Sequence, residues 1–249
     1  MAPLSPHEAR SLLRKVESIA LFPLSDDERA ALLAVPMQVA VIGPRQDIVR
    51  ERDRPSRCFT LLEGFACCYK TTDAGLRQVM AYYVPGDVPD LQSLHLKVLD
   101  NSLATVTRCR IGFIQHDAMR ALLRDHPRLV EVLWRLTLID GAIVREWVLN
   151  IGRREAKARL AHLFCEMATR LKAVGLLEGR SCDLPMTQAE LADALGLSTV
   201  HINRTLQDLR GTGRIVFQGG RLTVNDWDGL AADGEFDPCY LHLKQADAG

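Results

Sequence analysis

The sequence predicts an α+β protein with three parts: a β-rich N-terminal region that begins with helices, one long helix, and a C-terminal winged helix-turn-helix. Between residues 37 and 114, short β-rich runs alternate with turn residues. Apolar residues then recur every three or four positions along a single segment, which is typical of a helix. Two short helical segments around a glycine follow, and a pair of β-rich runs comes after them. We expect domains at 1–125, 126–150 and 151–249.

Composition indicates a globular protein without a strong charge bias. Apolar residues make up 47% of the 249 positions and charged residues 25%, which suffices for a sizeable core. The 31 basic and 31 acidic residues cancel, whereas a protein that binds nucleic acid often has an excess of positive charge. Residues 151–180 hold seven Lys or Arg against three Glu, and we expect a local basic surface there.

The N-terminus resembles no signal peptide, and no apolar run reaches the length of a membrane span. We therefore expect a cytoplasmic protein with no membrane partner. The seven cysteines form no CxxC pair and no cluster with histidines, so we expect no metal site. Two interpretations of the thiols stay open, a structural one and redox sensing. The cysteines are Cys58, Cys67, Cys68, Cys109, Cys165, Cys182 and Cys239.

The N-terminal region predicts helices followed by a β-barrel or sandwich. Residues 4–35 look helical, and Ser25 with Glu28 has the spacing of a capping box. Turn residues such as Gly43-Pro44 and Pro85-Gly86-Asp87 separate the strands that follow. The expected strands are Gln38–Ile42, Cys58–Leu62, Phe65–Lys70, Gln78–Tyr83, Ala104–Arg108 and Arg110–Ile114.

The next region predicts a short helix at Asp117–Arg124 and a long one that opens at His126-Pro127. A long apolar seam is typical of a two-stranded coiled coil, and the alternative is one helix buried in its own core. We prefer a dimer, because helix-turn-helix proteins usually bind paired half-sites as two-fold dimers. The expected interface residues are Leu129, Val132, Leu133, Leu136, Ile139, Ile143 and Trp147.

A helix at Arg153–Lys172 precedes the helix-turn-helix. The first helix of the motif is expected at Gln188–Leu195, Gly196 supplies a positive φ for the turn, and Ser198 caps the second helix. The outward face of that second helix fits a DNA major groove. The residues expected to bind DNA are Thr187, Gln188, Ser198, Thr199, Val200, His201, Asn203 and Arg204.

A β-hairpin follows the motif directly. Residues 213–224 contain two β-rich runs around Gly219-Gly220, a typical hairpin turn. A plain αα-hairpin is the alternative interpretation of the two helices, but it gives no reason for such a wing. The conjunction therefore favours a winged helix that binds DNA.

The order of these parts, the turn at Pro85-Gly86-Asp87, and the segments Gly152–Ala161 and Leu184–Ser198 together resemble the Crp/Fnr superfamily of bacterial transcription regulators. The resemblance covers nearly the whole chain. It implies that the barrel is a cyclic-nucleotide-binding-like jelly roll that holds a small effector against the long helix. It also implies a homodimer on double-stranded DNA and makes RNA polymerase a candidate partner.

The cassette that holds the cyclic phosphate in such proteins departs here from the family pattern. By resemblance, the effector pocket includes Gly86, Asp87, Asn101 and Ser102. Asn101 stands where the family has an arginine that grips phosphate, and Asp90-Leu91 replaces the second Gly-Glu. We therefore expect no cyclic nucleotide, although His95 or Lys97 offers a compensating group. The effector stays unidentified.

Two further departures concern cofactors and base recognition. The N-terminal cysteine cluster of iron–sulfur members is missing, and nothing suggests haem, so we expect no cofactor. On the recognition helix, the positions that read bases in known members hold Thr199, Val200 and Arg204. Arg204 is retained and can contact guanine, Val200 can touch a thymine methyl, and Asn203 can read adenine.

Three alternatives stay open or are set aside. We expect no enzyme, since the sequence has no nucleophile elbow, P-loop or dinucleotide fingerprint. The winged helix of a sensor or scaffold can instead contact proteins, and the zero net charge favours that alternative mildly. Within the leading hypothesis, a chain that has lost its effector would bind DNA constitutively.

Overall fold

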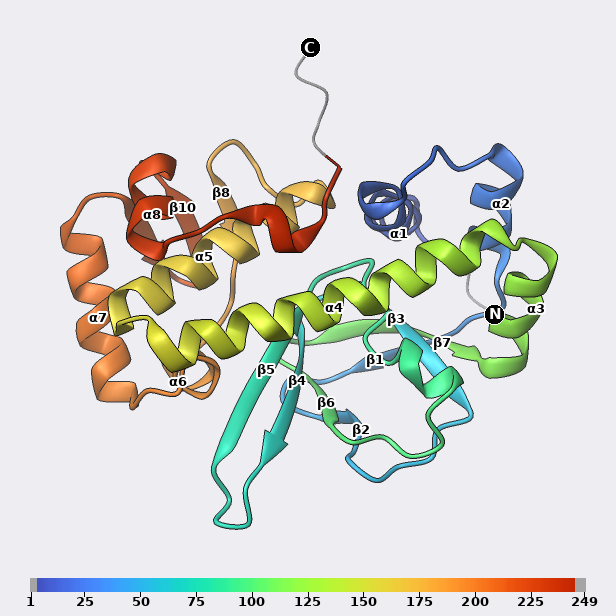
Figure 1. Cartoon of the computed structure of the whole chain (residues 1–249), viewed down its shortest axis with the longest axis horizontal. Coiled ribbons are helices and arrows are strands. Elements are labelled where there is room, and N and C mark those ends of the chain that lie inside the picture. Colours follow the sequence, from blue (N-terminus) through green and yellow to red (C-terminus); the bar gives the residue numbers. More distant parts are fainter. Residues whose placement is uncertain (1–3, 245–249) are drawn as a thin grey trace. The chain divides into compact units, whose positions relative to one another are not determined.

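The computed structural model describes residues 4–244 and contains the predicted parts in the predicted order (Figure 1). The chain divides into two compact units. Of the described residues, the first unit holds 4–70, 82–141 and 242–244, and the second holds 71–81 and 142–241. The division falls inside the long helix, between Gly141 and Ala142, so that helix contributes to both units.

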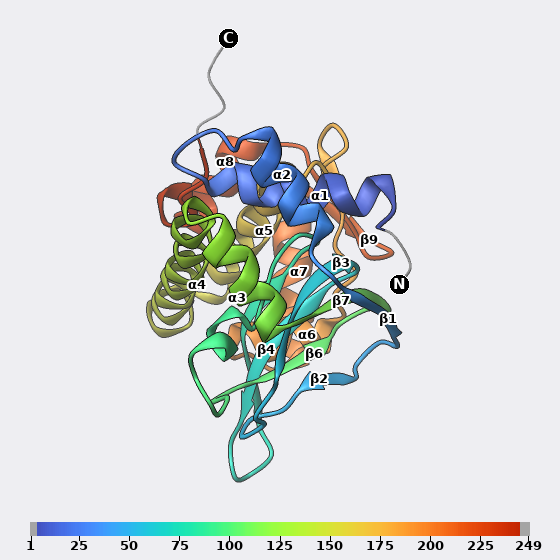
Figure 2. The same cartoon turned by 90° about the vertical axis from the view of Figure 1, so that its right-hand side faces the viewer.

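The first unit opens with α1 (Pro6–Ile19) and α2 (Asp26–Ala34), and both start at capping boxes. The predicted box at α2 is present: the Glu28 N–H donates to Ser25 Oγ (3.1 Å) and the Ser25 N–H donates to Glu28 Oε2 (2.7 Å). Helix α1 lies beside β3 (Arg57–Glu63), as Figure 2 shows. Lys15 Nζ of α1 lies 2.6 Å from Asp87 Oδ1, and both side chains are buried.

The β-rich region forms two antiparallel sheets with the strand orders β1-β7-β3 and β2-β6-β4-β5 (Figure 1). Phe59, Leu61, Leu103 and Ile111 are fully buried in its core. The short strand β2 escaped prediction, and β6 begins two residues before the predicted strand. The remaining elements here are β1 (Gln38–Ile42), β2 (Asp47–Val49), β4 (Ala66–Thr71), β5 (Arg77–Tyr83), η1 (Leu91–Leu94), β6 (Ser102–Thr105) and β7 (Cys109–Gln115).

Helix α3 (His116–Asp125) leads into the long helix α4 (Arg128–Arg153). The seven residues expected in a dimer interface, Leu129, Val132, Leu133, Leu136, Ile139, Ile143 and Trp147, are only 1–5% exposed in the single chain. These side chains face the chain's own interior. The prediction that they form the dimer interface is therefore corrected: they pack within a single chain. The exposed apolar residues of α4 are Val130, Trp134, Leu138, Val144, Val148 and Leu149.

The second unit contains the winged helix-turn-helix. Two helices, α8 and η2, follow the wing and are called here the C-terminal addition. A third strand, β8, joins the predicted hairpin in the order β8-β10-β9. Gly219 and Gly220 both have positive φ (59° and 75°), as the predicted turn requires. Its elements are α5 (Ala156–Ala173), β8 (Ser181–Asp183), α6 (Gln188–Leu195), α7 (Thr199–Gly211), β9 (Ile215–Gln218), β10 (Arg221–Val224), α8 (Trp227–Gly234) and η2 (Pro238–Leu241).

Among residues 4–244, no helix combines the length and apolar character needed to cross a membrane. In the same range, no group of three or more His, Cys, Asp or Glu side chains is placed to hold a metal ion.

Candidate functional site

The first helix of the motif, α6, is fixed at its start by Thr187. The Glu190 N–H donates to Thr187 Oγ1 (3.2 Å), and the Thr187 N–H donates to Glu190 Oε2 (2.7 Å). This capping box satisfies backbone N–H groups that would otherwise have no partner. Helix α6 ends at Gly196, whose φ of 64° is the left-handed conformation that the sequence predicted for the turn.

The second helix, α7, begins at the predicted cap, where the His201 N–H donates to Ser198 Oγ (3.2 Å). Ile202, Leu206 and Leu209 are buried, as the helical spacing requires. All eight residues expected to bind DNA are exposed, and Val200 is 77% exposed. Burying apolar side chains on one face of α7 therefore leaves its polar residues on the other, open face.

One hydrogen bond joins the two helices on this open face. Asn203 Nδ2 of α7 donates to Gln188 Oε1 at the start of α6, over 3.3 Å. The bond uses one of the two N–H groups of the Asn203 amide and leaves the other, together with Oδ1, available. Both residues are among those expected to bind DNA, but the bond between them depends on the fold and was not predicted.

Arg159 of α5 positions the motif from behind, a role that sequence analysis missed. Its Nη1 donates to the Leu195 carbonyl at the C-terminus of α6 (3.0 Å), and its Nε donates to the Arg154 carbonyl (2.7 Å). A cation at a helix C-terminus satisfies free carbonyl groups and interacts favourably with the helix dipole. Only the fold brings these segments together, so no local pattern signals the contact.

A buried polar cluster around Glu166 ties the C-terminal addition to α5. Trp147 Nε1 and the Tyr240 hydroxyl both donate to Glu166 Oε2, at 2.9 and 2.8 Å, and Arg170 Nη1 donates to Oε1 at 3.1 Å. His162 lies 3.0 Å from the Tyr240 hydroxyl, and burial lowers the pKa of its imidazole. Since these contacts all lie within the second unit, the cluster supports the winged helix from inside.

Three of the seven cations in residues 151–180, where we expected a local basic surface, are instead paired with carboxylates. Arg154 is buried and pairs with Glu146 (2.8 Å), Arg170 is buried beside Glu166, and Lys157 pairs with Asp233 (3.0 Å). These cations hold the unit together, and a count of charges along the sequence does not reveal such pairing.

Arginines of the wing are also engaged, in contrast to Arg204. Arg221 pairs with Glu178 and Asp183, both at 2.8 Å, and Arg214 pairs with Asp226 and Asp233. Within the described part of the chain, Arg204 has neither an acidic partner nor a hydrogen bond. Its guanidinium is therefore free to meet an external ligand.

The residues expected in the effector pocket lie buried in the first unit. Asp87 pairs with Lys15 and accepts from the Val84 N–H (2.8 Å). Asn101 Nδ2 donates to Cys68 Sγ (3.1 Å), and Ser102 Oγ accepts from the Glu51 N–H (3.0 Å). The structure thus bonds all three polar side chains to their own chain.

Gly86, the fourth residue expected in the effector pocket, lies in close contact with α1. Its φ is 95°, and a Cβ at this position would lie 2.7 Å from Lys15 Cβ. Only glycine allows α1 to approach the turn so closely.

The thiols of this protein are mostly buried and poorly reactive. Six of the seven cysteines are buried, and Cys239 is exposed. Burial raises the pKa of Cys58, Cys68 and Cys165 to about 12, which disfavours the nucleophilic thiolate. For the buried cysteines these surroundings favour the structural interpretation.

Two family models match this chain. Residues 41–126 match the cyclic nucleotide-binding domain, and residues 158–233 match the Crp-like helix-turn-helix domain. The chain belongs to the Crp/Fnr family. This family consists of transcription regulators rather than enzymes, and the chain accordingly carries the DNA-binding helix-turn-helix of such a regulator.

Similar proteins extend the match over most of the chain. The transcriptional activator protein FnrL of Cereibacter sphaeroides is 24% identical over 226 residues, which cover 88% of this chain and 90% of FnrL. The nitrogen fixation regulation protein FixK of Bradyrhizobium diazoefficiens is 26% identical over 185 residues, or 73% of this chain and 75% of FixK. The solved structure of FixK2 from Bradyrhizobium japonicum has the same fold, with a TM-score of 0.72 and 21% identity over 79% of this chain and 96% of FixK2.

Proposed function

We propose that this Crp/Fnr family member is a homodimeric, sequence-specific DNA-binding regulator whose cassette does not take a cyclic nucleotide. The observation that carries the proposal is the open face of α7, where polar residues without acidic partners extend from a helix that is capped at its start and buried on its other side. FnrL, a relative, is named as a transcriptional activator. Activation would make RNA polymerase the second partner.

Base recognition falls to three exposed residues of α7. Arg204 can contact O6 and N7 of guanine in a bidentate manner, and the Asn203 amide can pair with adenine. Val200 offers an apolar contact for a thymine methyl. Thr187, Gln188 and Ser198 lie at the helix starts, where polar groups commonly bind phosphate. His201 extends from the same face and can reach a base or a phosphate.

The exposed apolar row of α4 supports the homodimer. Val130, Trp134, Leu138, Val144 and Val148 fall within about 120° of the helix circumference at 100° per residue. Large apolar side chains on one exposed helix face favour a partner helix. The seven buried apolar residues of α4 then hold the helix to its own chain, and the exposed apolar row meets the other copy.

The cassette does not fit a cyclic phosphate. Asn101 carries no charge, and its amide is already bonded to Cys68. Asp87 would repel an anion, and its ion pair engages the nearby Lys15. An effector of another chemical class, or constitutive DNA binding, follows from this arrangement.

The salt dependence of binding separates a DNA-binding regulator from a protein-contact scaffold. Affinity of the full chain for a mixed duplex pool, measured by fluorescence anisotropy, should fall steeply as salt rises because bound cations are released from DNA. A scaffold would show no binding even at low salt. Replacement of Leu138 by Arg should give a monomer in analytical ultracentrifugation and weaken DNA binding. A dimer that survives this change would place the interface elsewhere.

A further inference from the structure

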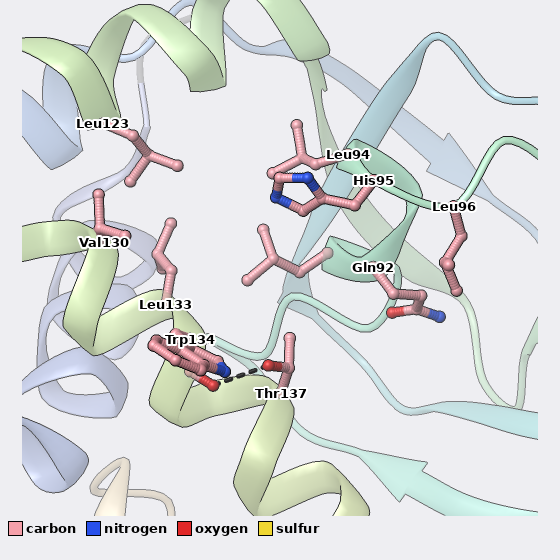
Figure 3. Close-up of a pocket in the computed structure, with 10 residues that line it drawn as sticks. Gln92, Leu94, His95, Leu96, Leu123, Val130, Leu133, Trp134 and Thr137 are labelled. Atoms are coloured by element: carbon pink, nitrogen blue, oxygen red, sulfur yellow. Dashed lines mark hydrogen bonds between the residues drawn. The ribbon is translucent and has the colours of Figure 1, made fainter.

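A half-open cavity of about 430 Å³ lies in the first unit, between η1 and the N-terminal half of α4. Figure 3 shows Leu94 and His95 on one side of it and Val130 and Leu133 on the other, with Trp134 near one end. Pockets for small molecules typically measure roughly 300–1,000 Å³ and are mostly apolar. This cavity falls within that class by size and by lining.

The lining decides what kind of molecule fits. No Lys, Arg, Asp or Glu side chain contributes to it. An ionised ligand would therefore lose its hydration without a compensating charge, which is costly. Thr137 Oγ1 donates to the Trp134 carbonyl (2.7 Å), whereas the side chains of Gln92 and His95 have no partner among the described residues. One or two polar groups of a ligand can pair with these two side chains.

This cavity is distinct from the cassette positions that resemblance assigns to an effector. Gly86, Asp87, Asn101 and Ser102 do not line it, although Leu91 and Leu94 belong to the same loop. Two of its lining residues, Val130 and Trp134, also belong to the exposed row of α4. A molecule in the cavity would contact the same side chains that are proposed to meet the second copy.

We propose that the cavity between η1 and α4 binds a small, uncharged and largely aromatic molecule, which contacts Trp134 beside the dimer face. The preference for aromatic chemistry follows from the indole of Trp134 and the imidazole of His95, since flat rings stack favourably on one another. The proposal rests on the proposed function only where it makes this molecule an effector. Binding itself is a property of one chain.

Two fluorescent probes test the proposal on the full chain without DNA. N-phenyl-1-naphthylamine is uncharged, and 8-anilino-1-naphthalenesulfonate has the same aromatic body with an added sulfonate. We expect one saturable site per chain for the uncharged probe and at least about tenfold weaker binding of the sulfonate. Energy transfer from tryptophan to the bound probe should drop in Trp134→Phe. Equal binding of both probes, or no saturation, would overturn the proposal.

A matched pair of substitutions locates the probe. Thr137→Phe places a phenyl group in the cavity and should weaken binding of the uncharged probe by at least about tenfold. Arg124→Phe places the same group at an exposed position of α3 that neither lines the cavity nor belongs to the exposed row of α4, and it should leave the affinity unchanged. Thermal unfolding checks that both variants fold. Equal effects of the two substitutions would contradict the assignment.

The second copy of the chain is the rival occupant. If the partner filled the cavity, the wild-type dimer would reject the probe and the monomeric Leu138→Arg variant would bind it, a result that overturns the proposal. Binding by both forms supports it. DNA binding is measured separately by anisotropy, so loss of DNA binding with retained probe binding would refute the proposed function and leave the cavity assignment intact.

Discussion

On α7, Asn203 and Arg204 extend from an exposed helix face, whereas in the cassette Asp87 and Asn101 are buried and bonded to their own chain. Val200 on α7 is 77% exposed, and Asn101 is 7% exposed. Polar groups that stay free at a surface can exchange water for an external ligand, but groups already paired inside the fold contribute to stability instead. The family resemblance marks both regions as binding sites, and their surroundings distinguish them.

Breaking the ion pair between Lys15 and Asp87 should give the largest effect on stability. Lys15→Met leaves the Asp87 carboxylate buried without its cation, which typically costs about 3–5 kcal/mol. Urea denaturation measures the loss. Arg204→Ala serves as the control and should change stability by less than about 0.5 kcal/mol. A Lys15→Met protein of normal stability would show that Asp87 does not depend on this pair.

The pH dependence of stability tests the buried carboxyl of Asp90. Its Oδ1 accepts from the Phe59 N–H (2.9 Å), its Oδ2 has no partner among the described residues, and burial raises its pKa to about 7. Because the folded-state pKa lies above that of the unfolded chain, the protonated form stabilises the fold at low pH, and this contribution is lost as pH rises towards 7. Relative to Asp90→Asn, the wild type should lose roughly 3 kcal/mol between pH 4 and 7. Urea denaturation at several pH values measures the free energy of unfolding of both proteins. If this free energy changed with pH in the same way for both, the raised pKa of Asp90 would be refuted.

Removal of the free guanidinium on α7 should weaken DNA binding without affecting the fold. Arg204→Ala is expected to cost about 1–3 kcal/mol of binding free energy and to relax specificity at one base. Anisotropy titrations against duplexes altered at single positions measure both effects. Arg108→Ala, which removes an exposed arginine from the turn between β6 and β7, controls for the loss of charge. A uniform loss over all sequences would instead make Arg204 a phosphate contact.

The smallest effect is expected for an exposed arginine that is already paired. Arg221 of the wing is bound by Glu178 and Asp183, so Arg221→Ala should change the dissociation constant for DNA by less than about threefold. The same titrations compare it with Arg204→Ala. If the two variants lose equal affinity, ion pairing does not distinguish the wing from α7.

Local patterns predicted the elements well, because caps and turns depend on neighbouring residues. The boxes and caps at Ser25 and Ser198 and the positive φ of Gly196 and Gly219 are all present. Three-residue strands such as β2 and β8 are too short to give a period.

Contacts between distant segments were beyond prediction. The apolar spacing of α4 predicted a helix correctly. The same spacing occurs in helices buried in a core and in coiled coils, so it could not show which partner the apolar face contacts. The seven residues predicted to form the dimer interface are buried in their own chain. The same limit hid the role of Arg159 and the pairing of Arg154, since both depend on segments that only the fold brings together.

Sequence-specific DNA binding by a homodimer is tested most directly by selection of bound sites from random duplex DNA by the purified full chain. A homodimeric reader predicts an enriched two-fold symmetric site whose half-sites lie about one helical turn, roughly 10 base pairs, apart. Arg204→Ala should lose preference at one guanine in each half-site. Failure to enrich any sequence at low salt would show that the chain is not a sequence-specific DNA-binding regulator.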